Sequence, residues 1–151
     1  MKKSQVLENM KRGHSLFDEK IWIKFNLLLA QNVSLDASIY FSYLFSIESY
    51  LLSKKASYFA KKEYWFICKK DNAKSKINMC FSRQDKSVEE LKKANLIRTK
   101  LGQGKLKWFQ IDWDSFITQY NEWYSDMIEA KKEKYMNNFD DSEIEEDDLE
   151  I

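Results

Sequence analysis

Glycine and proline are scarce in this 151-residue chain, which contains three glycines and no proline. Few positions can therefore take a positive φ or a rigid turn, which favours helices and excludes collagen-like, proline-rich and loop-dominated architectures. Two of the three glycines, Gly102 and Gly104, lie in the short segment 101–104, between strand-like runs at 96–100 and 105–111. This placement predicts a β-hairpin with its turn at 101–104.

Charge is strongly segregated along the chain, although the formal net charge is only +1. Residues 140–151 hold eight acids and no base, so the rest of the chain carries +9. Within that rest, residues 54–107 hold sixteen lysines and arginines against five acids, a net charge of +11. A basic body of this kind predicts a polyanionic partner, and the acidic segment at 137–151 reads as a disordered tail.

The first half of the chain predicts an arm, a long helix and a short strand. Residues 1–20 are polar and read as an arm or short frayed helix, and 21–30 form an apolar patch. Ser34 is a candidate N-cap for a helix to about Ser53. One face of that helix would hold Ala37, Tyr40, Phe41, Leu44, Ile47 and Leu51. A basic connector at 54–63 would lead into a strand at 64–68, and two carboxylates argue against a membrane span in the long helix.

Two further helices are predicted before the hairpin. Asp71 or Asn72 would cap a brief helix through Ile77, and 78–81 would form a turn. Ser82, with Asp85 three residues later, would cap a second helix that ends at Asn95 in the left-handed conformation. This helix would bury Val88 and Leu91, and Gln84 in part. It would present Arg83, Lys86, Glu90 and Lys93 outward.

A long amphipathic helix is predicted at 113–136, with Asp112 or Asp114 as its cap. Its apolar stripe would either close the core of the same domain or pair with the same helix of a second subunit. The dimerisation candidates on this stripe are Trp113, Phe116, Ile117, Tyr120, Tyr124 and Met127.

The predicted order of elements indicates a mainly α fold with a small β-hairpin, of the α+β class, arranged as a winged helix-turn-helix at 21–112. A helix of roughly a dozen residues fits the major groove of DNA, and a basic hairpin beside it can meet phosphates or the minor groove. The candidate base contacts are Arg83, Gln84 and Lys86. The candidate DNA backbone contacts are Lys74, Lys76, Ser87, Arg98, Lys100, Lys105 and Lys107.

Other chemistry has little support in the sequence. Trp65, Trp108 and Phe109 could stack on unpaired bases, but their strand positions favour core packing. Cys68 and Cys80 lack metal-ligand spacing and are expected to be buried free thiols. Asp112 and Asp114 could bind a cation, but capping explains them.

We find no phosphate-loop or dinucleotide fingerprint, and we expect no enzyme activity, no cofactor and no metal. The cysteine count and the absence of an apolar leader after Met1 predict a reducing cytoplasm.

Residues 21–111 resemble the amino-terminal winged-helix domain of plasmid replication initiators of the RepA type and, more loosely, DnaD-like and phage replisome-organiser domains. The resemblance lies in 37–44, in the strand 64–67, in 87–97 with Asn95 where a glycine is usual, and in the hairpin tip 102–105. Such initiators usually carry a separate carboxy-terminal domain, whereas here one helix and an acidic tail follow. The resemblance implies DNA binding and dimerisation.

Two classes of function follow from these observations. The first is a sequence-specific double-stranded DNA-binding protein of a plasmid, phage or integrative element, which binds repeats or palindromes as a dimer. It would act in replication initiation or regulation, or as a partition or relaxosome adaptor. The second is a protein-interaction winged helix whose acidic tail recruits or inhibits a basic partner.

Overall fold

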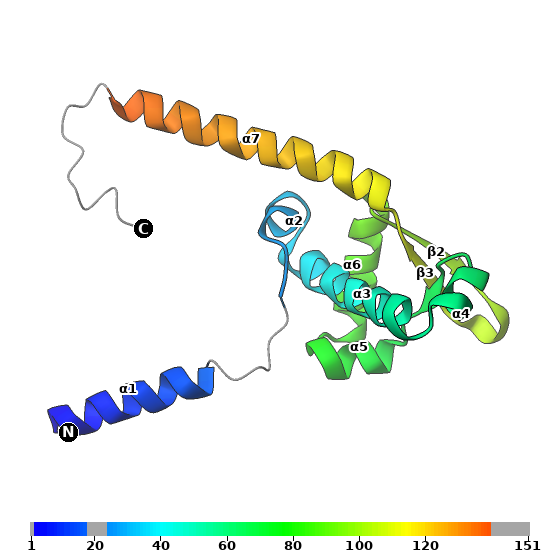
Figure 1. The fold of residues 1–151 in the computed structure, drawn as a ribbon, viewed down its shortest axis with the longest axis horizontal. Coiled ribbons are helices and arrows are strands. Elements are labelled where there is room, and N and C mark those ends of the chain that lie inside the picture. Colours follow the sequence, from blue (N-terminus) through cyan, green and yellow to red (C-terminus); the bar gives the residue numbers. More distant parts are fainter. Residues whose placement is uncertain (1, 18–23, 140–151) are drawn as a thin grey trace.

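The computed structural model describes residues 2–17 and 24–139, and these residues are mostly helical with one small sheet (Figure 1). The helices before the sheet are α1 (Lys3–Phe17), α2 (Leu27–Asn32), α3 (Leu35–Lys54) and α4 (Ala56–Lys61). The strand β1 (Phe66–Ile67) follows, then α5 (Lys70–Ile77) and α6 (Phe81–Lys93). The strands β2 (Ile97–Leu101) and β3 (Lys107–Ile111) flank a 3-10 turn, η1 (Gln103–Lys105). The helix α7 (Trp113–Phe139) is the last element of the described residues.

The predicted hairpin forms the larger part of a three-stranded antiparallel sheet. β3 is central, with β2 on one side and β1 on the other. Gly104 takes a positive φ of 69°, as the turn prediction requires, and Lys105 shares that conformation with a φ of 60°. Gly102 is needed for a different reason, because a Cβ there would collide with the Trp108 indole. Gly104 therefore allows the left-handed turn, and Gly102 allows the Trp108 indole to pack closely against the backbone.

The capping predictions hold for some helices and fail for others. Ser34 caps α3, because its Oγ accepts from the Ala37 N–H at 3.0 Å, and Asp112 accepts likewise from Ser115 before α7. Asn95 is left-handed with a φ of 58° after α6, as predicted.

Two predicted caps are wrong. The cap position of α5 is Lys69 and that of α6 is Cys80, neither with a side-chain cap bond, so Asp71, Asn72 and Ser82 lie inside the helices. For α6 the reason is tertiary. Met79 is buried next to a left-handed Asn78, and this sharp turn lets the helix begin before Ser82.

Two segments are more helical than predicted. The basic connector at 54–63 contains α4, which buries Phe59 in the core. The arm at 1–20 contains the 15-residue helix α1, on which Val6, Leu7 and Met10 are exposed. The predicted acidic tail from 140 onward and residues 21–23 of the apolar patch lie outside the described residues.

The core lies between α3, α6 and the inner face of the sheet. Leu44 of α3, Leu91 of α6 and Phe109 of β3 are almost completely buried there, together with Phe59 and Phe66. Of the aromatic residues expected to pack, Phe109 is buried, whereas Trp65 and Trp108 are half-buried on the outer face. Cys68 is a buried free thiol as predicted, but Cys80 is exposed, because it occupies the start of α6.

None of the helices that the structure describes is both long enough and apolar enough to cross a bilayer. The helix α3, whose two carboxylates argue against a span, buries one face in the core.

Candidate nucleic-acid interface

The helix predicted to carry the base contacts, α6, has one buried and one exposed face. Gln84, Ser87, Val88 and Leu91 are buried against the core. Ser82, Lys86, Glu89 and Lys93 are all exposed, and their spacing of four, three and four residues places them on the opposite side of the helix. Arg83 and Glu90 lie at one border of this outward face, and Asp85 lies at the other.

The prediction that Gln84 contacts DNA bases is wrong, because its side chain is buried. The side chain is only 1% exposed, and its Nε2 donates to the backbone carbonyls of Lys70 at 3.0 Å and Met79 at 2.8 Å. These two bonds tie α6 to the start of α5 and to the turn before α6. A polar residue in the first turn of a helix looks like a surface residue in sequence, but here it satisfies buried carbonyls.

Ser87 is also wrongly predicted, as a phosphate contact. It is 1% exposed, and its Oγ donates to the Arg83 carbonyl at 2.9 Å, with the Met79 sulfur at 3.7 Å. The Ser87 hydroxyl therefore has partners within the protein and is not available to a phosphate.

Arg83 is exposed but already bound by a carboxylate. Its Nε donates to Asp36 Oδ2 at 2.9 Å, and its Nη2 donates to Asp36 Oδ1 at 2.6 Å. Asp36 lies in the first turn of α3, so the pair joins the beginnings of two helices. The hydrogen bond to Arg83 lowers the pKa of Asp36, and the same bond raises the pKa of Arg83, so both groups are charged at neutral pH.

The lysines of α5 differ in the contacts that their ammonium groups make. Lys70 pairs with Asp85 at 2.7 Å, and both Lys70 and Lys74 lie over the Phe81 ring, at 5.6 Å and 5.8 Å from its centroid. Lys74 and Lys76, the two predicted phosphate contacts on this helix, are exposed. The cation–π contacts hold the ammonium groups of Lys70 and Lys74 near the amino-terminal end of α6.

The sheet register separates the four basic residues predicted on the hairpin. Ile97, Thr99 and Leu101 pair with Ile111, Phe109 and Lys107 on the inner face. Arg98 and Lys100 pair with Gln110 and Trp108, so by alternation they lie on the outer face, away from α6.

The contacts of these residues agree with that division. Arg98 donates to Gln110 at 2.7 Å and to Asp112 at 2.8 Å, and the Lys100 ammonium lies 4.3 Å from the Trp65 ring centroid. Lys105 is exposed at the tip. Lys107 is half-buried on the side of α6, and burial lowers its pKa, with Lys92 contributing in the same direction.

The stripe predicted on the last helix divides into residues that pack on the domain and residues that remain exposed. Trp113 and Phe116 pack against Phe41 of α3, with ring centroids 5.8 Å and 5.2 Å away. Tyr120 continues this stack at 5.6 Å from Phe116. These three side chains belong to the chain's own core or its edge. Ile117 and Tyr124 are 55% and 48% exposed, and Met127 is half-buried.

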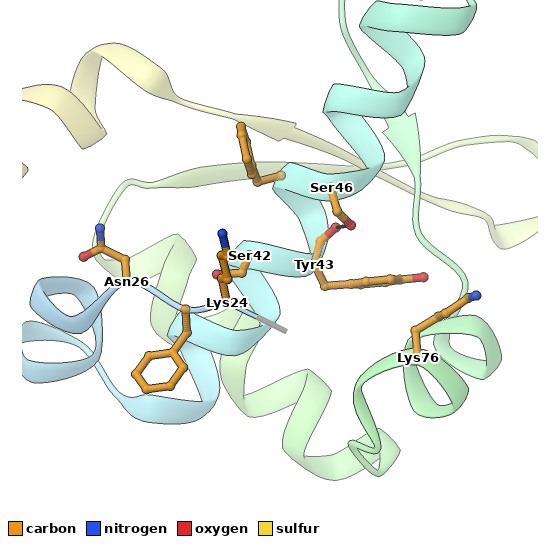
Figure 2. A pocket seen from close by; sticks show the side chains of 8 residues that line it. Lys24, Asn26, Ser42, Tyr43, Ser46 and Lys76 are labelled. Atoms are coloured by element: carbon orange, nitrogen blue, oxygen red, sulfur yellow. Dashed lines mark hydrogen bonds between the residues drawn. The ribbon is translucent and has the colours of Figure 1, made fainter. Parts of the chain in front are cut away.

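A pocket of about 570 Å³ opens between α3, α5 and the segment before α2 (Figure 2). Lys24, Lys76 and Tyr43 are among the residues that line it, and in Figure 2 the Tyr43 ring extends toward the Lys76 amino group. The serine hydroxyls in its wall are engaged, because Ser42 donates to the Ser38 carbonyl and Ser46 to the Tyr43 carbonyl. Its described lining includes no acid, histidine or cysteine.

Residues 2–17 and 24–139 contain no cluster of three or more His, Cys, Asp or Glu side chains that could hold a metal ion. Comparisons with protein-family models, with curated proteins and with solved structures found no match to this chain.

Three residues of the candidate interface do not follow from the sequence. Asp36 falls on the polar side of its predicted helix, and nothing in the sequence connects it to a residue 47 positions away. Ser82 is predicted as a cap, and Glu89 is not among the predicted contacts. The heptad-like spacing of Ser82, Lys86, Glu89 and Lys93 is the signal that could have identified the outward face.

Proposed function

We propose that this chain is a non-enzymatic, sequence-specific double-stranded DNA-binding protein with a winged helix-turn-helix domain. The element order supports this proposal: α3, α4, β1, α5, α6 and the β2–β3 hairpin follow one another, and β1 pairs with the side of β3 opposite β2. In such a domain α5 and α6 are the two helices of the helix-turn-helix, and the hairpin is the wing.

The observation that carries the proposal is the outward face of α6 together with the hairpin beside it, whose tip holds the exposed Lys105. α6 has 13 residues, presents Ser82, Lys86, Glu89 and Lys93 to solvent, and packs against β2. A helix of this length enters a major groove, where Lys86 and Ser82 can reach base edges and Glu89 can accept from a cytosine amino group. Lys105 at the hairpin tip would then meet the phosphates.

We propose that the protein dimerises through the exposed side of α7. Ile117, Tyr124 and Tyr135 lie seven and eleven residues apart, and each is about half exposed. Figure 1 shows α7 extending well past α2, α3 and α6, so its outer half presents surface that a second copy could cover. A dimer would suit repeated or palindromic sites. On the resemblance to plasmid initiators, we propose a role in replication initiation or regulation.

The experiment is fluorescence anisotropy with random and selected duplexes over a series of salt concentrations. Binding should weaken steeply as salt rises, because phosphate contacts release counterions. Lys105→Ala should weaken all sequences about equally and reduce the salt slope by about 1. Lys11→Ala removes the same charge from the exposed helix α1, outside the proposed interfaces, and serves as the matched control. Absence of binding to any duplex at low salt would refute the proposal.

A second candidate function is suggested by the outer part of α7. Ile128, Tyr135 and Met136 line a largely apolar groove there, bordered by Lys131 and Lys132. An apolar groove with a basic border suits an acidic amphipathic segment of a partner protein. Met136→Asp should abolish such an interaction without unfolding the domain, which circular dichroism checks.

A further inference from the structure

We propose that Asp36 is a positioning residue that holds Arg83 in the orientation needed to read a guanine. This inference rests on the proposed DNA-binding function and adds a base preference to it. The two side chains meet side-on: Arg83 uses Nε and Nη2, and Asp36 uses both carboxylate oxygens, at 2.9 Å and 2.6 Å.

The side-on geometry determines which donors of Arg83 are left. A guanidinium has five N–H groups, and Asp36 takes the one on Nε and one of the two on Nη2. Of the remaining three N–H groups, one on Nη1 and one on Nη2 point along the end formed by these two nitrogens. That end presents two parallel donors, which match the O6 and N7 acceptors of guanine in the major groove.

The position of Asp36 is itself fixed by the fold. The Ser34 cap begins α3 two residues earlier, and α3 packs along α6 through the buried Tyr40, Leu44 and Leu91. The carboxylate therefore projects from a rigid helix end. A free arginine loses rotamer freedom on binding DNA, whereas Arg83 held by Asp36 has lost it already, which favours the bound geometry.

The exposure of the pair is compatible with this role. The Arg83 side chain is 49% exposed and that of Asp36 is 33% exposed, so the end of the guanidinium can be reached from solvent. Arg83 lies in the first turn of α6, the part of a recognition helix that contacts base edges in helix-turn-helix proteins. Ordinary surface ion pairs are worth little in stability, which leaves orientation as the main contribution of this one.

The test begins with a duplex obtained by selection from a random library. Each guanine of that duplex is then replaced in turn by 7-deazaguanine, which lacks the N7 acceptor. For the wild-type chain, 7-deazaguanine at one particular guanine should weaken binding by about fivefold or more. Replacing that same guanine by another base should weaken binding by roughly 5- to 150-fold. Arg83→Ala should remove this discrimination.

Asp36→Ala should lower the discrimination at the same guanine by about tenfold, while binding to sequences without that guanine rises because one negative charge is lost. Asp85→Ala is the matched control: it removes one carboxylate from a different ion pair of the same helix and should leave the base preference unchanged. The double variant Asp36→Ala/Arg83→Ala should show the same base preference as Arg83→Ala alone. Circular dichroism verifies that each variant folds, and Asp36→Asn, which keeps one acceptor, should show an intermediate loss.

Three outcomes would overturn the inference while the proposed function stands. One is specific DNA binding with no guanine whose recognition depends on Arg83. Another is unchanged discrimination in Asp36→Ala. The third is a gain in discrimination in Asp36→Ala beyond that of Asp85→Ala, which would mean that Asp36 withholds Arg83 from DNA. Failure to bind any duplex refutes the proposed function itself, so the two failures are distinguishable.

Discussion

At the scale of single residues, burial decides which polar side chains of α6 are open to a partner. Gln84 and Ser87 stand next to Arg83 and Lys86 in the sequence, yet the first two are 1% exposed. The helical period explains the difference, because positions 84, 87, 88 and 91 share the face that packs on the core. A polar residue on that face has a structural partner instead of a ligand.

Gln84→Ala should therefore destabilise the fold. The substitution leaves the carbonyls of Lys70 and Met79 without their donor and opens space in the core, at a cost of about 3 kcal/mol in the free energy of unfolding. Urea denaturation followed by circular dichroism measures it. Lys86→Ala, on the exposed face, should change the same quantity by less than about 0.5 kcal/mol. Equal stabilities for the two variants would contradict the burial argument.

Glu48 should give the protein a measurable pH dependence. It is 8% exposed, it accepts from Trp113 Nε1 at 2.8 Å, and it lines a pocket with Arg98, Asp112 and Asp114. Burial raises the pKa of Glu48 above its ordinary value of 4.5, and the Trp113 bond opposes this only in part. The folded protein therefore holds this proton more tightly than the unfolded chain, and stability falls as pH rises from about 4.5 through the raised pKa.

Glu48→Gln removes that penalty, because glutamine resembles the neutral carboxyl and keeps an acceptor for Trp113. The variant should be more stable than the wild type at about pH 7 and about equally stable at about pH 3.5, as measured by urea midpoints. A wild type that is the more stable protein at neutral pH would show that the charged hydrogen bond outweighs the desolvation.

At the scale of elements, the hairpin depends on a contact that turn chemistry alone does not reveal. Gly102 has extended backbone angles and no positive φ, but the Trp108 indole occupies the space that a Cβ would fill. This contact packs the turn onto β3 and brings Lys105 to the tip.

Gly102→Ala should consequently displace the indole and cost about 1–3 kcal/mol in stability, as overpacking does. Gly13→Ala is the matched control, since Gly13 lies inside α1 and a Cβ added there would meet no other atom within 4 Å. That substitution should increase the helix content of α1 without a loss of stability. Tryptophan fluorescence and urea denaturation of both variants check the prediction, and an unperturbed Gly102→Ala protein would refute the contact.

At the scale of the whole molecule, charge segregation is the property that most affects a polyanionic partner. The eight acids at 140–151 offset most of the charge of a body that would otherwise carry +9. Under the proposed function, these acids would compete with DNA for the basic surface through long-range electrostatics.

Deletion of 140–151 should leave DNA affinity intact or raise it by up to about tenfold at low salt, and the difference should shrink as salt rises. Anisotropy of the full and shortened chains measures this. A 151-residue chain with the eight acids changed to Asn and Gln separates the effect of charge from that of length. Loss of DNA binding on deletion would contradict the prediction, and loss of a protein partner alone would indicate that the acidic segment itself recruits that partner.

Local sequence patterns determined much of this fold. The Ser34 cap, the left-handed Asn95 and the glycine-tipped hairpin were all predictable, because a cap, a C-terminal stop and a turn depend on a few neighbouring residues. The charge distribution is likewise a property of the sequence alone.

Only the tertiary structure decided which side chains face outward and which pairs form. Gln84 and Ser87 turn inward, Arg98 and Lys100 fall on the far face of the sheet, and Arg83 meets Asp36 from another helix. Each of these outcomes depends on packing and register between segments distant in the chain. Helical and strand periods give the relative orientation of neighbours, but only the packed core fixes which face is buried and which distant residue lies opposite.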